Sequence, residues 1–140
     1  MDKSPTWLKV VAIIALLWNL LGCLAFGYDL SLGAEDIAAM PAAHQALYAA
    51  RPAWAVAGTG LAVIAGALGC IGLLLGRKWA YPVFVLSLAG IVAQDFGLFV
   101  LVDGATLAGP VAVVMQGIVL VVAIALILLA RRGIARGWLR

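Results

Sequence analysis

The sequence carries very little charge for its length. Only 11% of its 140 residues are charged, 66% are hydrophobic, and the mean hydropathy is +1.18. A soluble domain usually has about a quarter charged residues, which cover its core with a hydrated surface. Nine basic and six acidic residues are too few for that purpose. We therefore expect residues 1–140 to form one domain whose outer surface faces lipid.

Cysteine and histidine are also scarce. Cys23 and Cys70 fall near opposite ends of their apolar segments, roughly 15 Å apart in depth at helical rise, whereas a disulfide allows a Cα separation of about 6 Å. His44 is the only histidine, so two histidines of one chain cannot ligate a haem. Neither a Cys-x-x-Cys pair, a metal-ligand cluster, a nucleophile–base pair nor a phosphate-binding glycine loop is present. The sequence predicts no catalytic site, metal or cofactor, and we expect no enzyme.

Four long apolar runs make up most of the chain, at residues 10–28, 53–75, 79–102 and 111–130. Each is close to the ~20 residues that a helix needs to cross ~30 Å of hydrocarbon. No alternation at period two suggests a barrel, and backbone groups in lipid must be hydrogen-bonded within their own segment. The sequence thus predicts an all-α membrane protein, an up-down bundle of four transmembrane helices with the lipid bilayer as its partner.

The basic residues indicate how this bundle is oriented. Eight of the nine lie on one side of the predicted membrane: Lys3, Lys9, Arg77, Lys78, Arg131, Arg132, Arg136 and Arg140. The positive-inside rule places that side in the cytoplasm, and with it both termini. The same bias argues against dual topology. Because these residues sit at the ends of apolar runs, the net charge of +3 does not indicate nucleic-acid binding.

The first apolar run has a second interpretation. Lys3 and Lys9 followed by apolar residues resemble a signal peptide, and residues 20–23 resemble a lipobox that would make Cys23 the lipidated first residue. The apolar run continues through Phe26, however, and Trp18 and Asn19 interrupt the supposed signal core. A full transmembrane span accounts for more of this pattern.

Between the first two spans, the outer loop at residues 29–52 is long enough to contain structure. Glu35 and Asp36 begin a helix-like stretch that ends near Met40, and Pro41 is well placed to start a second one. Apolar residues recur there at helical spacing, giving one stripe: Ile37, Met40, His44, Leu47 and Tyr48. One interpretation is a short amphipathic helix pair lying on the outer membrane surface. The other is a lid over an outward-facing cavity, formed by Met40, His44 and Tyr48. The second outer loop, residues 103–110, is short.

Every predicted span contains an uncharged polar residue at a similar depth: Asn19, Thr59, Gln94 and Gln116. Counted from the outer ends, all four lie roughly 9–13 Å deep. Each sits on a stripe of small residues, which let helices approach closely while polar side chains bond across the contact. We expect these faces to meet at the bundle centre. The polar layer then serves either as packing glue or as the lining of a polar, solute-accessible path.

Asp95 is the only ionisable side chain deep inside a predicted span, about 11 Å below its outer end. A charge there costs several kcal/mol, so such residues are candidates for function, and an unpaired buried carboxyl favours its neutral form. Helical geometry turns Asp95 away from Gln94, toward the side of Leu88, Ile91 and Leu98. We expect a protonatable carboxyl that couples transport or forms a bond across an oligomer interface.

Several short stretches also match a known kind of protein. They are Leu17-Trp18-Asn19-Leu20-Leu21-Gly22, the segment from Pro41 to Tyr48, Gly69-Cys70 with Leu73-Leu74-Leu75, Pro82-Val83-Phe84, and Ser87-Leu88. In these the chain resembles short bacterial four-span inner-membrane proteins that are commonly labelled "sugar transporter". The resemblance implies a bacterial inner-membrane protein and, more loosely, a transporter.

Two functions follow from these observations. In the first, the protein is a small oligomeric transporter of an unidentified small solute, with its polar layer near the path. Because one four-helix bundle has little interior volume, we expect that path between protomers or between helices of a homo-oligomer. Close-packing patterns would support assembly: Gly58/Ala62/Gly66, Gly72/Gly76 and Ala89/Ala93/Gly97. In the second, the protein is a membrane scaffold or accessory subunit that transports nothing.

Overall fold

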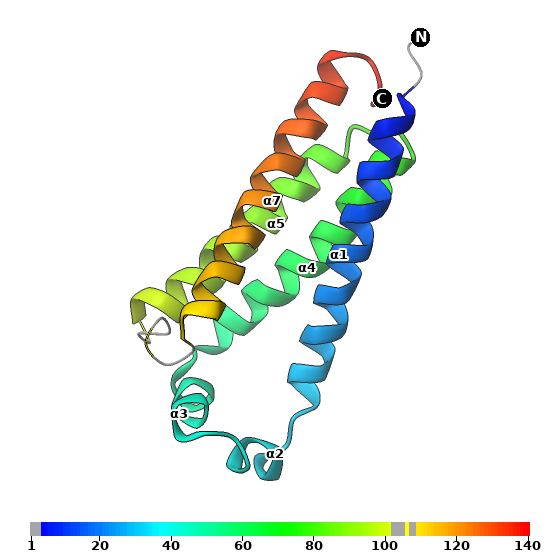
Figure 1. Cartoon of the computed structure of the whole chain (residues 1–140). Coiled ribbons are helices and arrows are strands. Elements are labelled where there is room, and N and C mark those ends of the chain that lie inside the picture. Colours follow the sequence, from blue (N-terminus) through cyan, green and yellow to red (C-terminus); the bar gives the residue numbers. More distant parts are fainter. Residues whose placement is uncertain (1–3, 102–105, 107–108) are drawn as a thin grey trace.

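The computed structural model describes residues 4–101, 106 and 109–140, and all regular structure in that part of the chain is helical (Figure 1). The elements are α1 (Thr6–Ser31), α2 (Ala34–Ala38), α3 (Ala42–Ala50), α4 (Ala53–Leu74), α5 (Ala80–Asp95), η1 (Phe96–Leu101) and α7 (Pro110–Ala135). Four helical segments are long and apolar enough to cross a membrane, with α5 continuing into η1 to form the third. The prediction of an all-α membrane protein with four candidate spans is therefore confirmed.

The helices extend beyond the apolar runs that predicted them. α1 begins at Thr6 and ends at Ser31, and α7 continues to Ala135, past two arginines. Backbone hydrogen bonds propagate along a helix whether or not its side chains are apolar, so hydropathy marks the part of a helix that suits lipid and not its ends. Lys3, the last residue of the third predicted run and most of the second outer loop lie outside the described residues.

The end of the third span differs from the regular helix that the sequence predicts. Phe96–Leu101 form a π-helix, η1, directly after Asp95. A π-helix bonds each residue to the fifth along, which widens the turn and changes the direction in which the following side chains point. The spacing of apolar residues in the sequence does not indicate where an α-helix changes into a π-helix.

Small residues make α4 the centre of the bundle. α4 packs against α1 on one side and α5 on another, and α7 packs against α5. A Cβ added at Gly58 would lie 2.8 Å from the carbonyl oxygen of Gly90, so the two backbones are nearly in contact. The face containing Gly58, Ala62 and Gly66 is buried within the chain. Our expectation that this face serves an oligomer is wrong, because intramolecular packing uses it.

One end of the bundle carries both termini and is closed by the C-terminal tail (Figure 1). The amide of Arg140 donates to Gly76 O at 2.8 Å, and the amide of Lys78 donates to Arg140 O at 2.9 Å. Trp138 packs edge-on against Trp7, with ring centroids 5.7 Å apart. Gly137 permits this return because its φ of 76° belongs to the left-handed region. We call this end the terminal end.

A buried apolar core fills the half of the bundle next to the terminal end. All four long helices contribute to it, and Leu139 from the tail is buried in the same cluster. Its members are Ala12, Ala15, Cys70, Leu73, Ala80, Phe84, Leu126, Ala130 and Leu139. The bundle is therefore solidly packed on this side.

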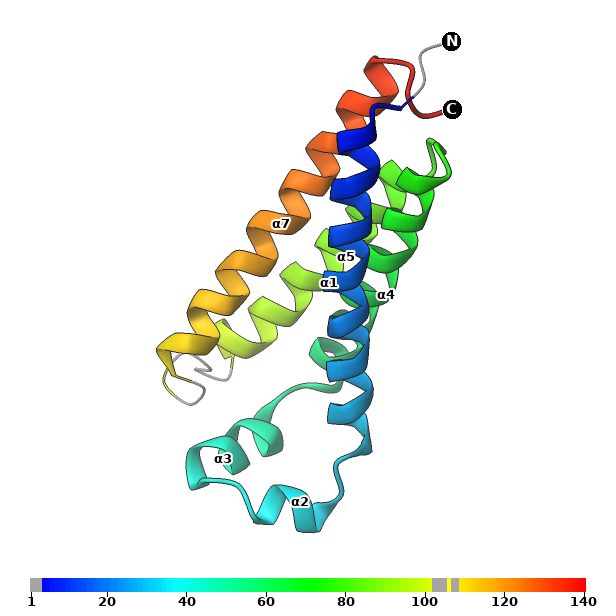
Figure 2. The same ribbon diagram turned by 45° about the vertical axis from the view of Figure 1, so that its right-hand side comes forward.

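The opposite end carries the loop between α1 and α4, and we call it the loop end (Figure 2). α2 and α3 lie there at the two positions that the sequence predicts. Ile37, Met40, Leu47 and Tyr48 are half-buried, whereas His44 is exposed. The predicted apolar stripe is thus present apart from His44. Cys23, the alternative lipidation site, lies inside the unbroken α1, and its thiol donates to Val63 O at 3.5 Å.

Candidate functional site

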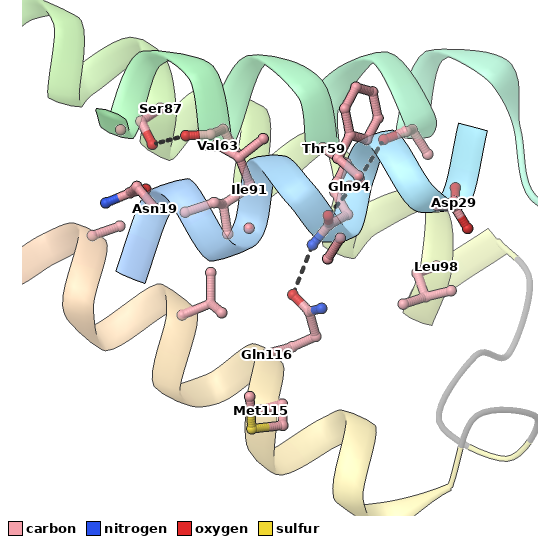
Figure 3. A pocket seen from close by; sticks show the side chains of 18 of the residues that line it. Asn19, Asp29, Thr59, Val63, Ser87, Ile91, Gln94, Leu98, Met115 and Gln116 are labelled. Atoms are coloured by element: carbon pink, nitrogen blue, oxygen red, sulfur yellow. Dashed lines mark hydrogen bonds between the residues drawn. The ribbon is translucent and has the colours of Figure 1, made fainter. Parts of the chain in front are cut away.

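A cavity of about 640 Å³ lies in the loop-end half of the bundle, between α1 and α7, and α4 and α5 form its floor (Figure 3). Its volume falls within the ~300–1,000 Å³ typical of small-molecule sites. Our expectation that one bundle of this size has little interior volume is wrong. α1 and α7 do not pack closely against each other, because the small residues of α4 draw α1 toward α4 and leave α7 on α5.

The cavity is mostly apolar, with polar side chains at three levels. At the loop end are Asp29, Tyr48 and Arg51; in the middle are Thr59, Gln94 and Gln116; at the deep end are Asn19 and Ser87. Apolar side chains line the space between these levels, including Leu21, Phe26, Val56, Val63, Phe84, Ile91, Leu98, Met115, Val119, Val122 and Leu126. The cavity therefore begins at a charged mouth and ends against the apolar core.

Three of the four predicted polar residues meet at the middle level. Thr59 Oγ1 donates to Gln94 Oε1, and Gln94 Nε2 donates to Gln116 Oε1 at 2.7 Å (Figure 3). Thr59 Oγ1 is also 3.2 Å from the carbonyl oxygen of Ala55, one turn earlier in α4. This network ties α4, α5 and α7 together by side-chain hydrogen bonds across the cavity floor.

Asn19 does not join this network, although the sequence places it at the same depth. Its Nδ2 donates to Ala15 O at 2.9 Å and is 3.8 Å from the Cys70 sulfur, while its Oδ1 packs against Gly66. α1 continues to Ser31, so Asn19 is roughly 18 Å from its loop-end terminus, against roughly 9 Å for Thr59 in α4. The expectation of one shared level is wrong because it assumes that all four helices end at the same height.

Ser87 is the most deeply buried polar side chain of the cavity wall. It is 5% exposed, and its hydroxyl donates to the carbonyl oxygen of Ala62 at 2.6 Å. This bond crosses from α5 to α4 next to the close approach of Gly58 and Gly90. Ser87 therefore fixes the packing of these two helices and presents no free hydrogen to the cavity.

Asp95 is half-buried and does not line the cavity. Its Oδ1 accepts a hydrogen bond from Gln94 Nε2 at 3.2 Å, so the two side chains are partners. As we expected, Asp95 does not share the face of α5 on which Gln94 lines the cavity, although the long glutamine side chain reaches back to its neighbour's carboxyl. Ile91 and Leu98, which we placed on the Asp95 side, line the cavity with Gln94. Asp95 thus touches the polar layer from outside the cavity.

The mouth of the cavity is formed by a compact cluster that joins the end of α1 to α3 and to Arg51 directly after it. Arg51 donates two hydrogen bonds to the carboxylate of Asp29, at 2.8 and 3.3 Å, and Tyr48 Oη donates to the same carboxylate at 2.7 Å. The Arg51 guanidinium also lies 4.5 Å from the centre of the Tyr48 ring. Burial, and then the hydrogen bond to Asp29, raise the pKa of Tyr48 above its usual value. We call these three residues the mouth cluster.

Two members of the mouth cluster were not predicted as site residues. Arg51 is the only basic residue in the outer loops, and Asp29 is the first acidic residue after the first span. Only their opposite charges, at the two ends of one loop, could have indicated from the sequence that they form a pair. Of the three predicted lid residues, only Tyr48 lines the cavity; Met40 and His44 lie away from it.

Within the described part of the chain, no group of three or more His, Cys, Asp or Glu residues is arranged to hold a metal ion. The site is instead a cavity of mixed apolar and hydrogen-bonding character in a chain with four candidate membrane spans. Compared with models of known protein families, with curated proteins and with solved structures, the chain matches none.

Proposed function

We propose that this protein is a small membrane transporter whose cavity receives a small solute in one half of the bilayer. The observation that carries the proposal is the cavity of about 640 Å³ between α1 and α7. It begins at the mouth cluster and ends at a packed core, as expected for one half of an alternating-access path. Among the described lining residues, only the three of the mouth cluster have ionisable side chains, which favours an uncharged or largely apolar solute.

Charge distribution supports an orientation with the mouth facing outward. The basic residues of the terminal end are Lys9, Arg77, Lys78, Arg131, Arg132, Arg136 and Arg140, whereas Arg51 at the loop end is paired with Asp29. The positive-inside rule then puts the termini in the cytoplasm and the cavity on the outer side. The resemblance to short bacterial four-span proteins suggests a bacterial inner membrane. Reporter fusions at Arg140 and in the α2–α3 loop test this. A cytoplasmic loop would contradict it.

The transport proposal is tested by uptake into proteoliposomes. Labelled solutes of graded polarity are compared: a monosaccharide, an amino acid and a fatty acid. Val119→Phe fills the cavity from α7, and Val121→Phe adds the same bulk to the exposed face of that helix. We expect at least one solute to enter faster with the wild-type protein and Val121→Phe than with Val119→Phe. Equal uptake in all three and in protein-free vesicles would contradict transport.

Access to the cavity is tested separately with engineered cysteines. Val119→Cys lies on the cavity wall, and Val121→Cys lies on the exposed face of α7, only two residues further along. In a Cys23→Ala background, a small hydrophilic thiol reagent should modify Val119→Cys and spare Val121→Cys, which faces lipid. Modification of neither cysteine would mean that the cavity is closed to water.

Assembly into a homo-oligomer would use a different face. A shallow apolar depression on α5 is lined by Trp54, Val85, Leu88, Ala89, Val92, Ala93 and Phe96. Ala89 is exposed and belongs to a predicted close-packing pattern, so it permits the close approach of a second helix, whereas Ala93 of the same pattern lies against Gly58 of α4. Native mass spectrometry of the wild type and Ala89→Leu tests this part of the proposal.

A scaffold or accessory subunit is the second candidate, and one observation favours it. Thr59, Gln94 and Gln116 hydrogen-bond to one another, as expected for side chains that hold helices together. On this alternative the cavity is occupied by membrane lipid and no solute passes. A protein that assembles normally, lacks uptake activity and loses stability when Gln94 is replaced would support the scaffold.

A further inference from the structure

The polar side chains of the cavity wall are already hydrogen-bonded, either to one another or to backbone carbonyl oxygens. The hydroxyls of Thr59 and Ser87 donate to protein acceptors, and both amide hydrogens of Gln94 have acceptors on Gln116 and Asp95. Within the described residues, no fully buried side-chain nitrogen or oxygen lacks a hydrogen-bond partner. Below the mouth, the wall therefore offers a ligand few groups with which to bond.

Two amide atoms are the exceptions within the described chain. Gln116 Nε2 donates to no other described residue, and Asn19 Oδ1 packs against Gly66 without a hydrogen bond. A sugar that entered this space would leave most of its hydroxyls unpaired, and each unpaired group costs ~1–3 kcal/mol. We call the cavity wall below the mouth the saturated wall, because nearly all its hydrogen-bonding groups are already paired. It selects against polyhydroxylated solutes and favours a ligand whose buried part is apolar.

The cavity is also elongated along the helices. Its lining on α7 runs from Ala112 to Leu126, a rise of roughly 21 Å, and on α4 from Ala55 to Gly66, roughly 16 Å. A chain can lie along this length, whereas a compact ring system fills only part of it. The space lies between α1 and α7, on which exposed apolar side chains such as Leu21 and Met115 face the bilayer.

The mouth cluster differs in chemistry from the rest of the cavity. Arg51 uses two of its five N–H donors on Asp29, so three remain. The ion pair presents a positive and a negative group side by side, with the Tyr48 ring against the guanidinium. A phosphate can bond to the remaining Arg51 donors, and an ammonium group can approach Asp29. This arrangement complements a zwitterionic head group.

From the saturated wall, the elongated shape and the mouth cluster, we infer that the ligand is a single-chain zwitterionic lipid, such as a lysophospholipid, drawn from the outer half of the bilayer. Its acyl chain lies between α1 and α7 and its head group contacts Arg51 and Asp29. One chain fits the cavity of about 640 Å³, whereas a phospholipid with two chains is too large. This inference rests on the proposed function and names the substrate class of the same site.

The test uses the full-length protein in lipid nanodiscs and a lysophosphatidylethanolamine probe with a photoreactive group near the end of its chain. Cross-linked peptides are identified by mass spectrometry. We expect labelling of the cavity face, at residues 87–91 of α5 and 119–126 of α7, and saturation with increasing probe. Excess unlabelled lysophosphatidylethanolamine should compete. Labelling that never saturates, or that falls only on exposed residues such as Val92 and Leu128, would overturn the inference.

Matched variants test separately the part of the cavity that holds the acyl chain and the mouth cluster that holds the head group. Val119→Phe should weaken apparent probe affinity about tenfold, the factor expected when roughly two methylene groups lose their apolar contacts, and Val121→Phe should leave it unchanged. Arg51→Gln should weaken lysophospholipid binding while sparing a probe with an uncharged glycerol head. Equal weakening of both probes by Arg51→Gln would overturn the assignment of the head group.

The failure of this inference can be told apart from failure of the proposed function. Val119-dependent uptake of a water-soluble solute, together with no saturable lipid labelling, would overturn the lipid assignment and leave transport standing. Unreactive Val119→Cys, no uptake and no saturable labelling would overturn both. Saturable labelling blocked by Val119→Phe supports the lipid assignment, and Val119-dependent uptake of the same lysophospholipid supports both.

Discussion

Arg51 and Asp29 form a two-pronged ion pair across the loop that joins α1 to α4, with hydrogen bonds of 2.8 and 3.3 Å. Asp29 lies in the last turn of α1, where the helix dipole disfavours a negative charge, so its pairing with a cation offsets that cost. Tyr48 donates to the same carboxylate and joins α3 to the pair. These contacts set the position of α3 at the mouth of the cavity.

Breaking this ion pair should loosen α3 without unfolding the bundle. The two charged side chains are 28% and 20% exposed, so the coupling energy between them should be about 1 kcal/mol or less. We expect Arg51→Gln to speed amide hydrogen exchange in residues 42–50 severalfold and to leave residues 53–74 unchanged. The charge-swapped pair, Asp29→Arg with Arg51→Asp, should partly restore protection. Uniform protection in all variants would show that the pair does not hold α3.

The phenol of Tyr48 should ionise at higher pH than an ordinary tyrosine, whose pKa is about 10, because burial and the Asp29 carboxylate both raise its pKa. A group whose pKa is raised by folding stabilises the fold below its unfolded pKa. That stabilisation is lost as pH rises through the folded pKa. The mouth cluster should therefore weaken only at pH values above about 10. Ultraviolet titration of the wild type against Tyr48→Phe isolates this group.

The same titration in Asp29→Asn tests whether the carboxylate contributes to the raised pKa of Tyr48. It removes the negative charge beside Tyr48 but leaves the burial, so the Tyr48 pKa should fall while staying above its usual value. An unchanged titration in Asp29→Asn would mean that the carboxylate does not act on the phenol.

The contact between α4 and α5 should tolerate no side chain at Gly90. A Cβ there would lie 2.5 Å from Gly58 O and 2.7 Å from Ala62 N, and both are backbone atoms that cannot rotate away. We expect Gly90→Ala to destabilise the protein by about 1–3 kcal/mol in thermal unfolding in detergent. Gly117→Ala is the matched control, since nothing lies within 4 Å of its added Cβ. It should be neutral or stabilising by up to about 1 kcal/mol, and a similar loss in both variants would contradict close backbone packing.

The sequence predicts the helices well because lipid leaves so few alternatives. Long apolar runs must be helical, and prolines at 41, 52 and 110 mark where helices begin. The buried small residues of α4 were also predicted, because close helix contacts require them. The π-helix after Asp95 was missed, since its hydrogen-bond shift leaves no mark on apolar spacing.

The site was predicted only in part, for a geometric reason. Thr59, Gln94 and Gln116 meet as their depths suggest, whereas Asn19 is displaced because α1 extends to Ser31. The cavity arises from which helices pack against which, and a hydropathy pattern does not specify pairing. Arg51 and Asp29 are 22 residues apart, so only their opposite charges hinted at contact.

Gln94 should be the most costly member of the polar layer to replace. It accepts from Thr59 and donates to both Gln116 and Asp95, so Gln94→Leu removes three side-chain hydrogen bonds. Thr59→Val removes one interhelical bond, which in membrane proteins averages about 0.6 kcal/mol. We expect Gln94→Leu to cost about 1–3 kcal/mol. The double variant should be less destabilised than the sum of both, which would show coupling; strict additivity would mean that the bonds are independent.

Asp95 offers a test that separates a role in transport from a role in folding. Asp95→Asn keeps an oxygen that can accept from Gln94 Nε2, so stability should change by less than about 0.5 kcal/mol. The variant cannot exchange a proton, however, and a half-buried carboxyl next to the polar layer is suited to that exchange. We therefore expect uptake into proteoliposomes to lose its pH dependence while the oligomeric state measured by native mass spectrometry is retained. Loss of assembly with unaltered pH dependence would instead place Asp95 at an interface between protomers, and no change in either property would leave it without a role in transport or assembly.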